Sequence, residues 1–303
     1  MWIVLAFISA LCLGCYDISK KIALRQNAVV DVLTISVCVS AALLSMPLVL
    51  SRINPEMMVG TPFFVPALDG EAHLYTLLKS VIVLSSWIFG YISLKHLPLS
   101  VVSPLQATRP MWTLVGALLI FGERLNTWQW VGVMLAIGTI FAFSFRNRTE
   151  LKNATQIDKR YYICLALTIF IGACSGLYDK YLMRRYDHNA VQVYYTLYQA
   201  VMMLVAWAVM HRNEWKRKEK PVIRWTPAIV LISLFLIISD NVYMLALRDP
   251  DSLIAVISTI RRGGAVIGFA YGLLFLKEKD PWHKALCMLG ICAGLICLAI
   301  GSF

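Results

Sequence analysis

The chain lacks the sequence signatures of a soluble catalyst. It has no glycine-rich phosphate loop, no H-E-x-x-H zinc motif and no nucleophile elbow. Its five histidines are scattered near the ends of apolar stretches and form no cluster with carboxylates. We therefore expect no enzymatic activity and no cofactor. A membrane-embedded enzyme or receptor would need such a cluster in one cavity, and the sequence offers none.

The connecting segments between the apolar stretches also lack cysteine. All eight cysteines fall inside apolar stretches, whereas a disulfide framework or a zinc site would place them together with polar ligands. Cys12 and Cys15 form a C-x-x-C pair with no soluble redox domain around it, so we interpret them as small packing residues. The sequence predicts neither disulfides nor a bound metal.

Polar residues are scarce throughout the chain, which is 59% hydrophobic with a mean hydropathy of +0.69. A soluble domain is about 45–50% apolar. Stretches of about 20 apolar residues recur from end to end, each long enough to cross a bilayer. We predict an all-α, polytopic membrane protein with ten transmembrane helices. The expected spans are residues 2–21, 31–51, 74–95, 99–121, 127–145, 161–182, 190–211, 225–247, 251–276 and 282–302. The first stretch has no basic region before it and no small-residue cleavage site after it, so we expect a span there and not a signal peptide.

The net charge of +11 does not indicate nucleic-acid binding. Most Lys and Arg residues lie in the short segments between apolar stretches, such as 146–160 and 212–224. Basic residues in such segments set orientation in a membrane and contact anionic headgroups. We therefore expect a lipid bilayer and a small-molecule substrate as partners, and no nucleic acid.

The two halves of the chain are copies of each other. Cys12, Gly14, Tyr16 and Asp17 match Cys174, Gly176, Tyr178 and Asp179, and Tyr91, Pro98, Ser100, Arg109 and Gly116 match Tyr243, Pro250, Ser252, Arg261 and Gly268. We predict a first repeat over 1–145, a polar linker over 146–160 and a second repeat over 161–303. Because five spans is an odd number, the repeats should be inverted, which is typical of secondary transporters with a substrate site between the repeats.

These repeats carry a resemblance to a known family. The residues concerned are Gly14 to Lys21, Pro98 to Pro110, and the run GERLNTWQWVG from Gly122 to Gly132. With them the chain resembles the drug/metabolite transporter superfamily, and within it the EamA-type permeases of two five-helix repeats. The resemblance implies a transporter fold and leaves the substrate open. The second half repeats the run loosely, with Lys277 where the family has glycine and Arg262 where the first half has Pro110.

Arginines in the middle of apolar stretches are the strongest candidates for a site. Arg109 and Arg261 occupy matching places, and Arg262 follows directly. An arginine at the centre of a bilayer costs about 2.5–3.5 kcal/mol, so we expect Arg109 and Arg261 to bind an anionic group, with Arg262 at the rim. Pro110 cannot donate to the carbonyl of Gln106, so we expect a kink that exposes this oxygen to the cavity. The alternative is that the arginines pair with acidic residues and only stabilise the fold.

Four further residues are expected near the arginines. Asp240 lies inside the eighth predicted span, and the matching residue of the first half is Ile88. It could exchange a proton and couple transport to a gradient, or it could be a fixed counter-ion to an arginine. Its neighbour Asn241 is a candidate substrate ligand, as are Tyr91 and Tyr243, which share one repeat position.

A duplicated Tyr-Asp pair stands toward the far end of the first span of each half. The pairs are Tyr16 with Asp17 and Tyr178 with Asp179. The aspartates could form helix-end salt bridges with neighbouring lysines. They could also be symmetric gates that close in alternate conformations.

Taken together, these patterns predict a secondary-active transporter of a small anionic or zwitterionic metabolite, such as an amino acid, a carboxylate or a phosphorylated compound. It would work by alternating access, with a proton or a counter-substrate as the possible coupling partner. The alternative is a flippase for a lipid or a lipid-linked sugar on the same fold. We expect a bacterial cytoplasmic membrane. The family implies that both termini are cytoplasmic, whereas the distribution of Lys and Arg implies the opposite orientation.

Overall fold

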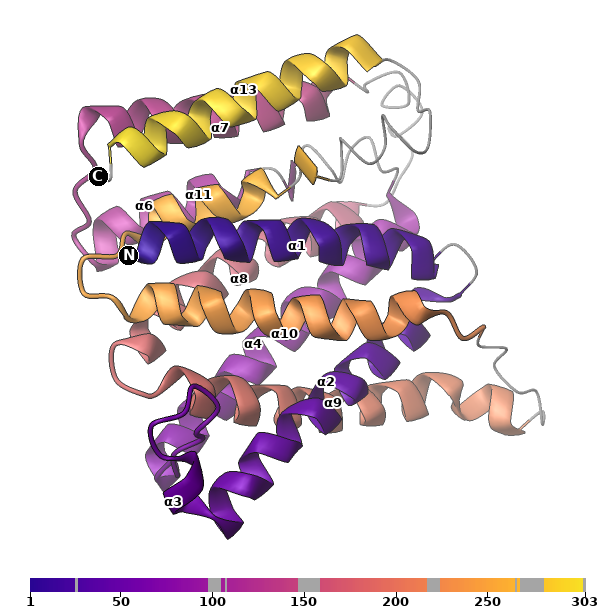
Figure 1. The fold of residues 1–303 in the computed structure, drawn as a ribbon. Coiled ribbons are helices and arrows are strands. Elements are labelled where there is room, and N and C mark those ends of the chain that lie inside the picture. The colour runs from indigo at the N-terminus through magenta and orange to yellow at the C-terminus, as the bar shows by residue number, and fades with distance from the viewer. Residues whose placement is uncertain are drawn as a thin grey trace.

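The chain forms a bundle of helices that run back and forth between two faces (Figure 1). The structure is a computed structural model. It describes residues 1–24, 27–97, 105–106, 108–146, 159–216, 224–264, 266–267 and 281–301. Most of the predicted linker, part of the fourth and ninth predicted spans, and the side chain of Tyr91 lie outside the described residues.

Eleven helices are defined within the described residues. They are α1 (Trp2–Leu24), α2 (Val29–Ile53), α3 (Pro55–Met58), α4 (Gly70–His96), α6 (Arg109–Ile120), α7 (Thr127–Arg146), α8 (Lys159–Met183), α9 (His188–Lys216), α10 (Pro227–Arg248), α11 (Ile254–Gly263) and α13 (Pro281–Ile300). The described part contains no strand. Each of the ten predicted spans corresponds to one of these helices, and the short helix α3 in the segment after α2 was not predicted.

Six helices are long and apolar enough to cross a membrane: α1, α2, α4, α8, α9 and α10. Two shorter apolar helices lie at Arg109–Ile120 and Leu289–Ile300. The prediction of an all-α integral membrane protein is confirmed for the described residues, and the number of ten spans stays a prediction.

The start of α6 differs from the expected kinked helix. α6 begins at Arg109, so Pro110 stands in its first turn and not in its interior. A proline is tolerated in a first turn because the N–H it lacks would have no partner within the helix. Arg109 is thereby placed at the beginning of a helix.

Both ends of the chain lie at the same face of the bundle (Figure 1), which we call the termini face. Hydrogen bonds identify the segments that meet there. Asn126 contacts Gly301, Asn189 contacts Pro62 and Phe64, and Arg248 contacts Asp187. At the opposite face, Asn27 after α1 contacts Arg224 before α10.

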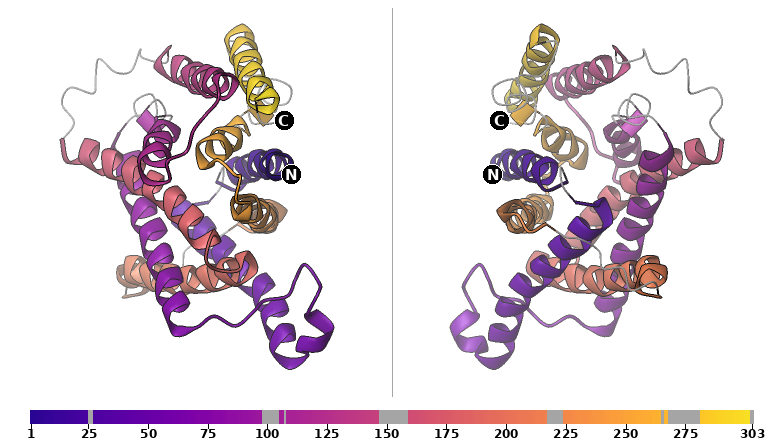
Figure 2. Two further views of the ribbon diagram at one scale, coloured as in Figure 1. Left: turned by 90° about the vertical axis from the view of Figure 1, so that its left-hand side faces the viewer. Right: turned by 90° about the vertical axis from the view of Figure 1, so that its right-hand side faces the viewer.

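The main helix contacts join the two halves of the chain. α1 packs on α10, α4 on α8, α2 on α9 and α7 on α13. Each pair takes one helix from residues 1–146 and one from residues 159–301. Figure 2 shows α7 and α13 side by side at one edge of the bundle.

Two of these helix pairs are joined by reciprocal polar contacts in their middle. In the α1–α10 pair, the Ser9 hydroxyl donates to the Ser239 carbonyl at 2.8 Å, and the Ser239 hydroxyl donates back at 2.9 Å. In the α4–α8 pair, the hydroxyls of Ser86 and Thr168 donate to each other's carbonyl at 3.1 and 3.3 Å. Such bonds link helices where hydrophobic attraction between them is weak.

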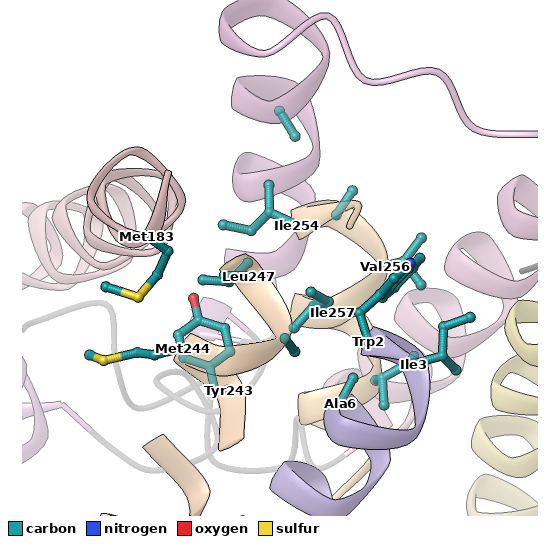
Figure 3. Close-up of a cluster of buried hydrophobic side chains, with 14 of the residues drawn as sticks. Trp2, Ile3, Ala6, Met183, Tyr243, Met244, Leu247, Ile254, Val256 and Ile257 are labelled. Carbon is teal, nitrogen blue, oxygen red and sulfur yellow. The ribbon is translucent and has the colours of Figure 1, made fainter. Parts of the chain in front are cut away.

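The largest buried apolar cluster lies on the side of the termini face. It combines the first half of α1 with the last turns of α8 and α10 and with most of α11, as shown for Trp2, Met183, Leu247 and Ile257 in Figure 3. Because these side chains are buried against one another, they fill the bundle between its middle and the termini face.

A matched pair of glycines tests the close packing of α7 on α13. A Cβ on Gly132 would lie 2.7 Å from the carbonyl oxygen of Gly294, whereas a Cβ on Gly138 meets no atom within 4 Å. We expect Gly132→Ala to lower the free energy of unfolding by about 1–3 kcal/mol, the usual cost of overpacking. Gly138→Ala should leave it unchanged or raise it, because alanine favours a helix over glycine. Thermal unfolding of the purified variants in detergent measures this, and equal melting temperatures would contradict the close approach.

Candidate functional site

A central cavity of about 400 Å³ opens between the helices. Small-molecule sites are about 300–1,000 Å³, so this cavity has the size for one small ligand. Its lining comes from the second half of α1, the first turn of α6, the last turns of α11 and the middle of α4, α8 and α10. The cavity therefore lies between the middle of the bundle and the opposite face, away from the closed termini face.

The described lining is rich in charge for the interior of a membrane protein. It contains five cationic and three anionic side chains, which are Lys20, Lys79, Arg109, Arg261 and Arg262 against Asp17, Asp179 and Asp240. Ionisable groups at such depth are costly and mark pathways for ions or substrates. Of the residues predicted from the sequence, the cavity brings together Tyr16, Asp17, Gln106, Arg109, Asp179, Asp240, Tyr243, Arg261 and Arg262.

Arg261 is already neutralised by an aspartate. Its guanidinium lies 2.8 Å from an Asp240 carboxylate oxygen and 4.0 Å from the centre of the Tyr243 ring, a distance typical of a cation–π contact. Its buried Nε has no hydrogen-bond partner among the described residues. In this conformation Asp240 is a counter-ion, one of the two roles that the sequence left open.

A second ion pair was not predicted from the sequence. Lys79 of α4 lies 2.5 Å from Asp179 of α8, and its ammonium donates to the Ser175 hydroxyl at 2.7 Å. The Tyr243 hydroxyl donates to the other oxygen of Asp179 at 3.4 Å. One alternative from the sequence paired Asp179 with a neighbouring lysine, whereas the structure pairs it with a lysine of the other half of the chain. The sequence feature that could have identified Lys79 as a site residue is its position inside an otherwise apolar stretch.

Arg109 has no carboxylate partner among the described residues. Its guanidinium donates to the Gly172 carbonyl of α8 at 2.6 Å. Gly172 lies so close that an added Cβ would be 2.4 Å from the guanidinium carbon. The positive charges of Arg261 and Arg262 also act on it across the cavity. Glycine at this position therefore gives Arg109 room to lie against α8, where no carboxylate of the described residues is within ion-pair distance of it.

Arg262 and Asp17 are both exposed to the cavity. Neither forms a hydrogen bond or an ion pair within 4.0 Å among the described residues, although their charges influence each other. Lys20 lies 5.7 Å from the centre of the Tyr16 ring. All three side chains belong to the cavity lining.

Two predicted site residues lie outside the cavity lining. The Asn241 amide donates to the side-chain oxygens of Asn189 and Gln192 at 2.9 and 2.8 Å, so it joins α10 to α9. Tyr178 stacks on Tyr181 with ring centres 5.7 Å apart, and its hydroxyl donates to the Tyr75 carbonyl at 3.1 Å. Tyr178 therefore belongs to the closed side, whereas the matching Tyr16 lines the cavity.

A buried ion pair closes the cavity toward the termini face. Lys180 lies 2.6 Å from Glu123, and their side chains are 1% and 2% exposed. The two carboxylate oxygens of Glu123 accept the backbone N–H groups of Ile254 and Ala255 at 2.7 and 3.2 Å. Glu123 therefore caps the first turn of α11, where a negative charge is favourable.

This arrangement defines a class of protein, because apolar helices long enough to cross a membrane surround a charged cavity, as expected for a membrane transporter. Residues 1–145 match the model of the EamA-like transporter family. This match covers residues 1–145 of the 303, and it confirms the predicted resemblance to the EamA-type transporters of the drug/metabolite transporter superfamily.

Comparison with solved structures shows the same fold. A chain described as "Crystal structure of protein" superposes with a TM-score of 0.71 at 11% identity, covering 99% of this chain and 96% of that chain. The likeness concerns the fold alone. No curated protein matches the chain.

Removing one partner of the buried pair should destabilise the protein. Lys180→Met leaves the Glu123 carboxylate buried without its cation, which costs about 3–5 kcal/mol. Adding Glu123→Gln removes that charge, so the double variant should recover part of the lost stability. The melting temperatures of the two variants and the parent measure this. A double variant less stable than Lys180→Met would contradict the assigned pairing.

Proposed function

We propose that the protein is a secondary-active transporter of a small anionic or zwitterionic metabolite, which binds in the central cavity. The observation that carries the proposal is the guanidinium of Arg109 in that cavity, which has no ion-pair partner among the described residues. A cation without a carboxylate partner at membrane depth is stabilised by a bound anion. The positive end of the α6 dipole lies beside it and favours the same charge.

Alternating access between two inverted five-helix repeats is supported by how the helices pair. The pairs α1–α10 and α4–α8 become equivalent when the halves are exchanged. Their reciprocal polar contacts, Ser9 with Ser239 and Ser86 with Thr168, lie within about one helical turn of equivalent positions. The family match ends at residue 145, where we place the end of the first repeat.

The structure has the features of a conformation closed at the termini face. The apolar cluster of Figure 3 and the Glu123–Lys180 pair lie between the cavity and that face. Tyr16 lines the cavity, whereas its repeat partner Tyr178 packs on the closed side, and Asp17 and Asp179 both line the cavity. We propose that the two tyrosines exchange environments during transport, with the aspartates beside them, which would make the Tyr-Asp pairs gates.

For Asp240, the role of a proton carrier is less well supported than the role of a counter-ion to Arg261. The 2.8 Å contact with Arg261 favours the ionised carboxylate. We therefore assign Asp240 to holding Arg261, and we propose that a counter-substrate or a proton bound elsewhere drives transport.

A flippase is also less well supported, because a lateral opening for lipids should be lined by apolar residues and this cavity is lined by charges. A bacterial cytoplasmic membrane remains our proposed location for the protein.

The proposal predicts that Arg109→Ala abolishes transport while the protein still inserts. Arg124 is exposed and lies outside the cavity, so Arg124→Ala is the matched control. Alanine, glutamate, succinate and glycerol 3-phosphate are first tested for thermal stabilisation of the purified protein. Compounds that stabilise it are then measured for uptake into proteoliposomes. We expect at least a tenfold loss for Arg109→Ala, since a charged hydrogen bond contributes about 1.5–3 kcal/mol.

A finer test moves the guanidinium without removing its charge. Gly172→Ala should push Arg109 from its place against α8 and weaken uptake, with the protein's melting temperature little changed. If Arg109→Ala transports like the parent, the arginine is structural and the proposed binding role is wrong.

A further inference from the structure

We propose that the substrate carries two negative charges, one held by Arg109 and the other by Arg262. The inference rests on the proposed transport function and narrows its substrate class. It follows from which charges of the cavity are already paired and which are left over.

The paired charges account for half of the charged lining. Lys79 is neutralised by Asp179 at 2.5 Å and Arg261 by Asp240 at 2.8 Å. Both pairs are supported by Tyr243, whose hydroxyl reaches Asp179 and whose ring faces Arg261. A ligand anion would have to compete with a carboxylate for either of these cations, so neither is the preferred anchor.

The remaining charged side chains are Arg109, Arg262, Lys20 and Asp17. Asp17 is close enough to Lys20 and Arg262 for its charge to act on both, yet it has no hydrogen bond within the described residues. It can offset one of the three cations. The described lining therefore keeps an excess of two positive charges when the cavity is empty.

The balance of charge in the cavity predicts the order in which ligands of different charge are preferred. Uncompensated charge in a low-dielectric interior is costly, and the charges of Arg109 and Arg262 repel each other. A dianion removes the whole excess, a monoanion removes half of it, and a zwitterion removes none. On this argument the order of preference is dianion, then monoanion, then zwitterion.

The two arginines line one cavity from different helices, so one ligand with two negative charges can contact both of them. Arg109 comes from α6 of the first half and Arg262 from α11 of the second half. The classes that share this chemistry are small dicarboxylates and phosphate monoesters, the latter carrying nearly two charges at neutral pH. A phosphate would draw both arginines to one group, whereas a dicarboxylate would bridge them.

The test compares ligands that differ by one charge and little in shape. Binding of succinate and of its monoamide, succinamate, is measured by calorimetry on the purified full-length protein, together with glycerol 3-phosphate, glutamate and alanine. We expect at least one of the two dianions to bind about tenfold more tightly than succinamate, glutamate and alanine. Binding of succinate alone identifies a dicarboxylate site, and binding of glycerol 3-phosphate alone identifies a phosphate site.

Variants separate this inference from the proposed function. Arg262→Gln should weaken the dianion about tenfold and the monoanions little, whereas Arg109→Ala should weaken every anion. The exposed control Arg124→Gln should match the parent, and melting temperatures check that each variant is folded. If alanine or a monoanion binds as tightly as both dianions, or if Arg262→Gln weakens all ligands equally, the dianion inference is wrong and a transporter of simpler metabolites stands. If none of the five compounds binds, the inference is overturned, and unaltered uptake by Arg109→Ala would overturn the proposed function separately.

Discussion

The fold around the cavity depends on one buried interaction, the cap that Glu123 forms on α11 with Lys180 as its counter-ion. Glu123 follows α6, Lys180 lies in α8, and the capped helix carries Arg261 and Arg262. Without the lysine the carboxylate would be a buried charge, and without the carboxylate the first N–H groups of α11 would lose their partners. Two residues that do not line the cavity therefore hold its arginines in place.

Polar contacts between the two halves of the chain also line the cavity. Lys79 of the first half meets Asp179 of the second, and Arg109 of the first half meets the backbone of Gly172 in the second. Each contact would change if the two halves moved relative to each other. The polar groups that shape the cavity thus depend on the relative position of the two halves, as the proposed transport mechanism would require.

Much of the fold could be predicted from the sequence, because apolar stretches of membrane length and matching residues in two halves are local signals. All ten predicted spans correspond to described helices, and Arg109, Arg261, Arg262 and Asp240 do line one cavity. The partners of these residues could not be predicted. Lys79 and Glu123 act through contacts between helices far apart in the chain, and Asn241 turns toward α9 because its amide finds two acceptors there. The spacing of residues along the chain does not show which side chains of distant helices come into contact.

The departures from repeat symmetry are as informative as the matches. Ile18 stands where the second half has Lys180, Ile88 where it has Asp240, and Pro110 where it has Arg262. The second half therefore supplies a buried cation, a counter-ion and a free arginine that the first half does not. An interaction like that of Lys180 with Glu123 cannot form through Ile18, so the first half lacks an equivalent of this buried ion pair. In the transport cycle proposed above, the two faces would therefore be closed by different contacts.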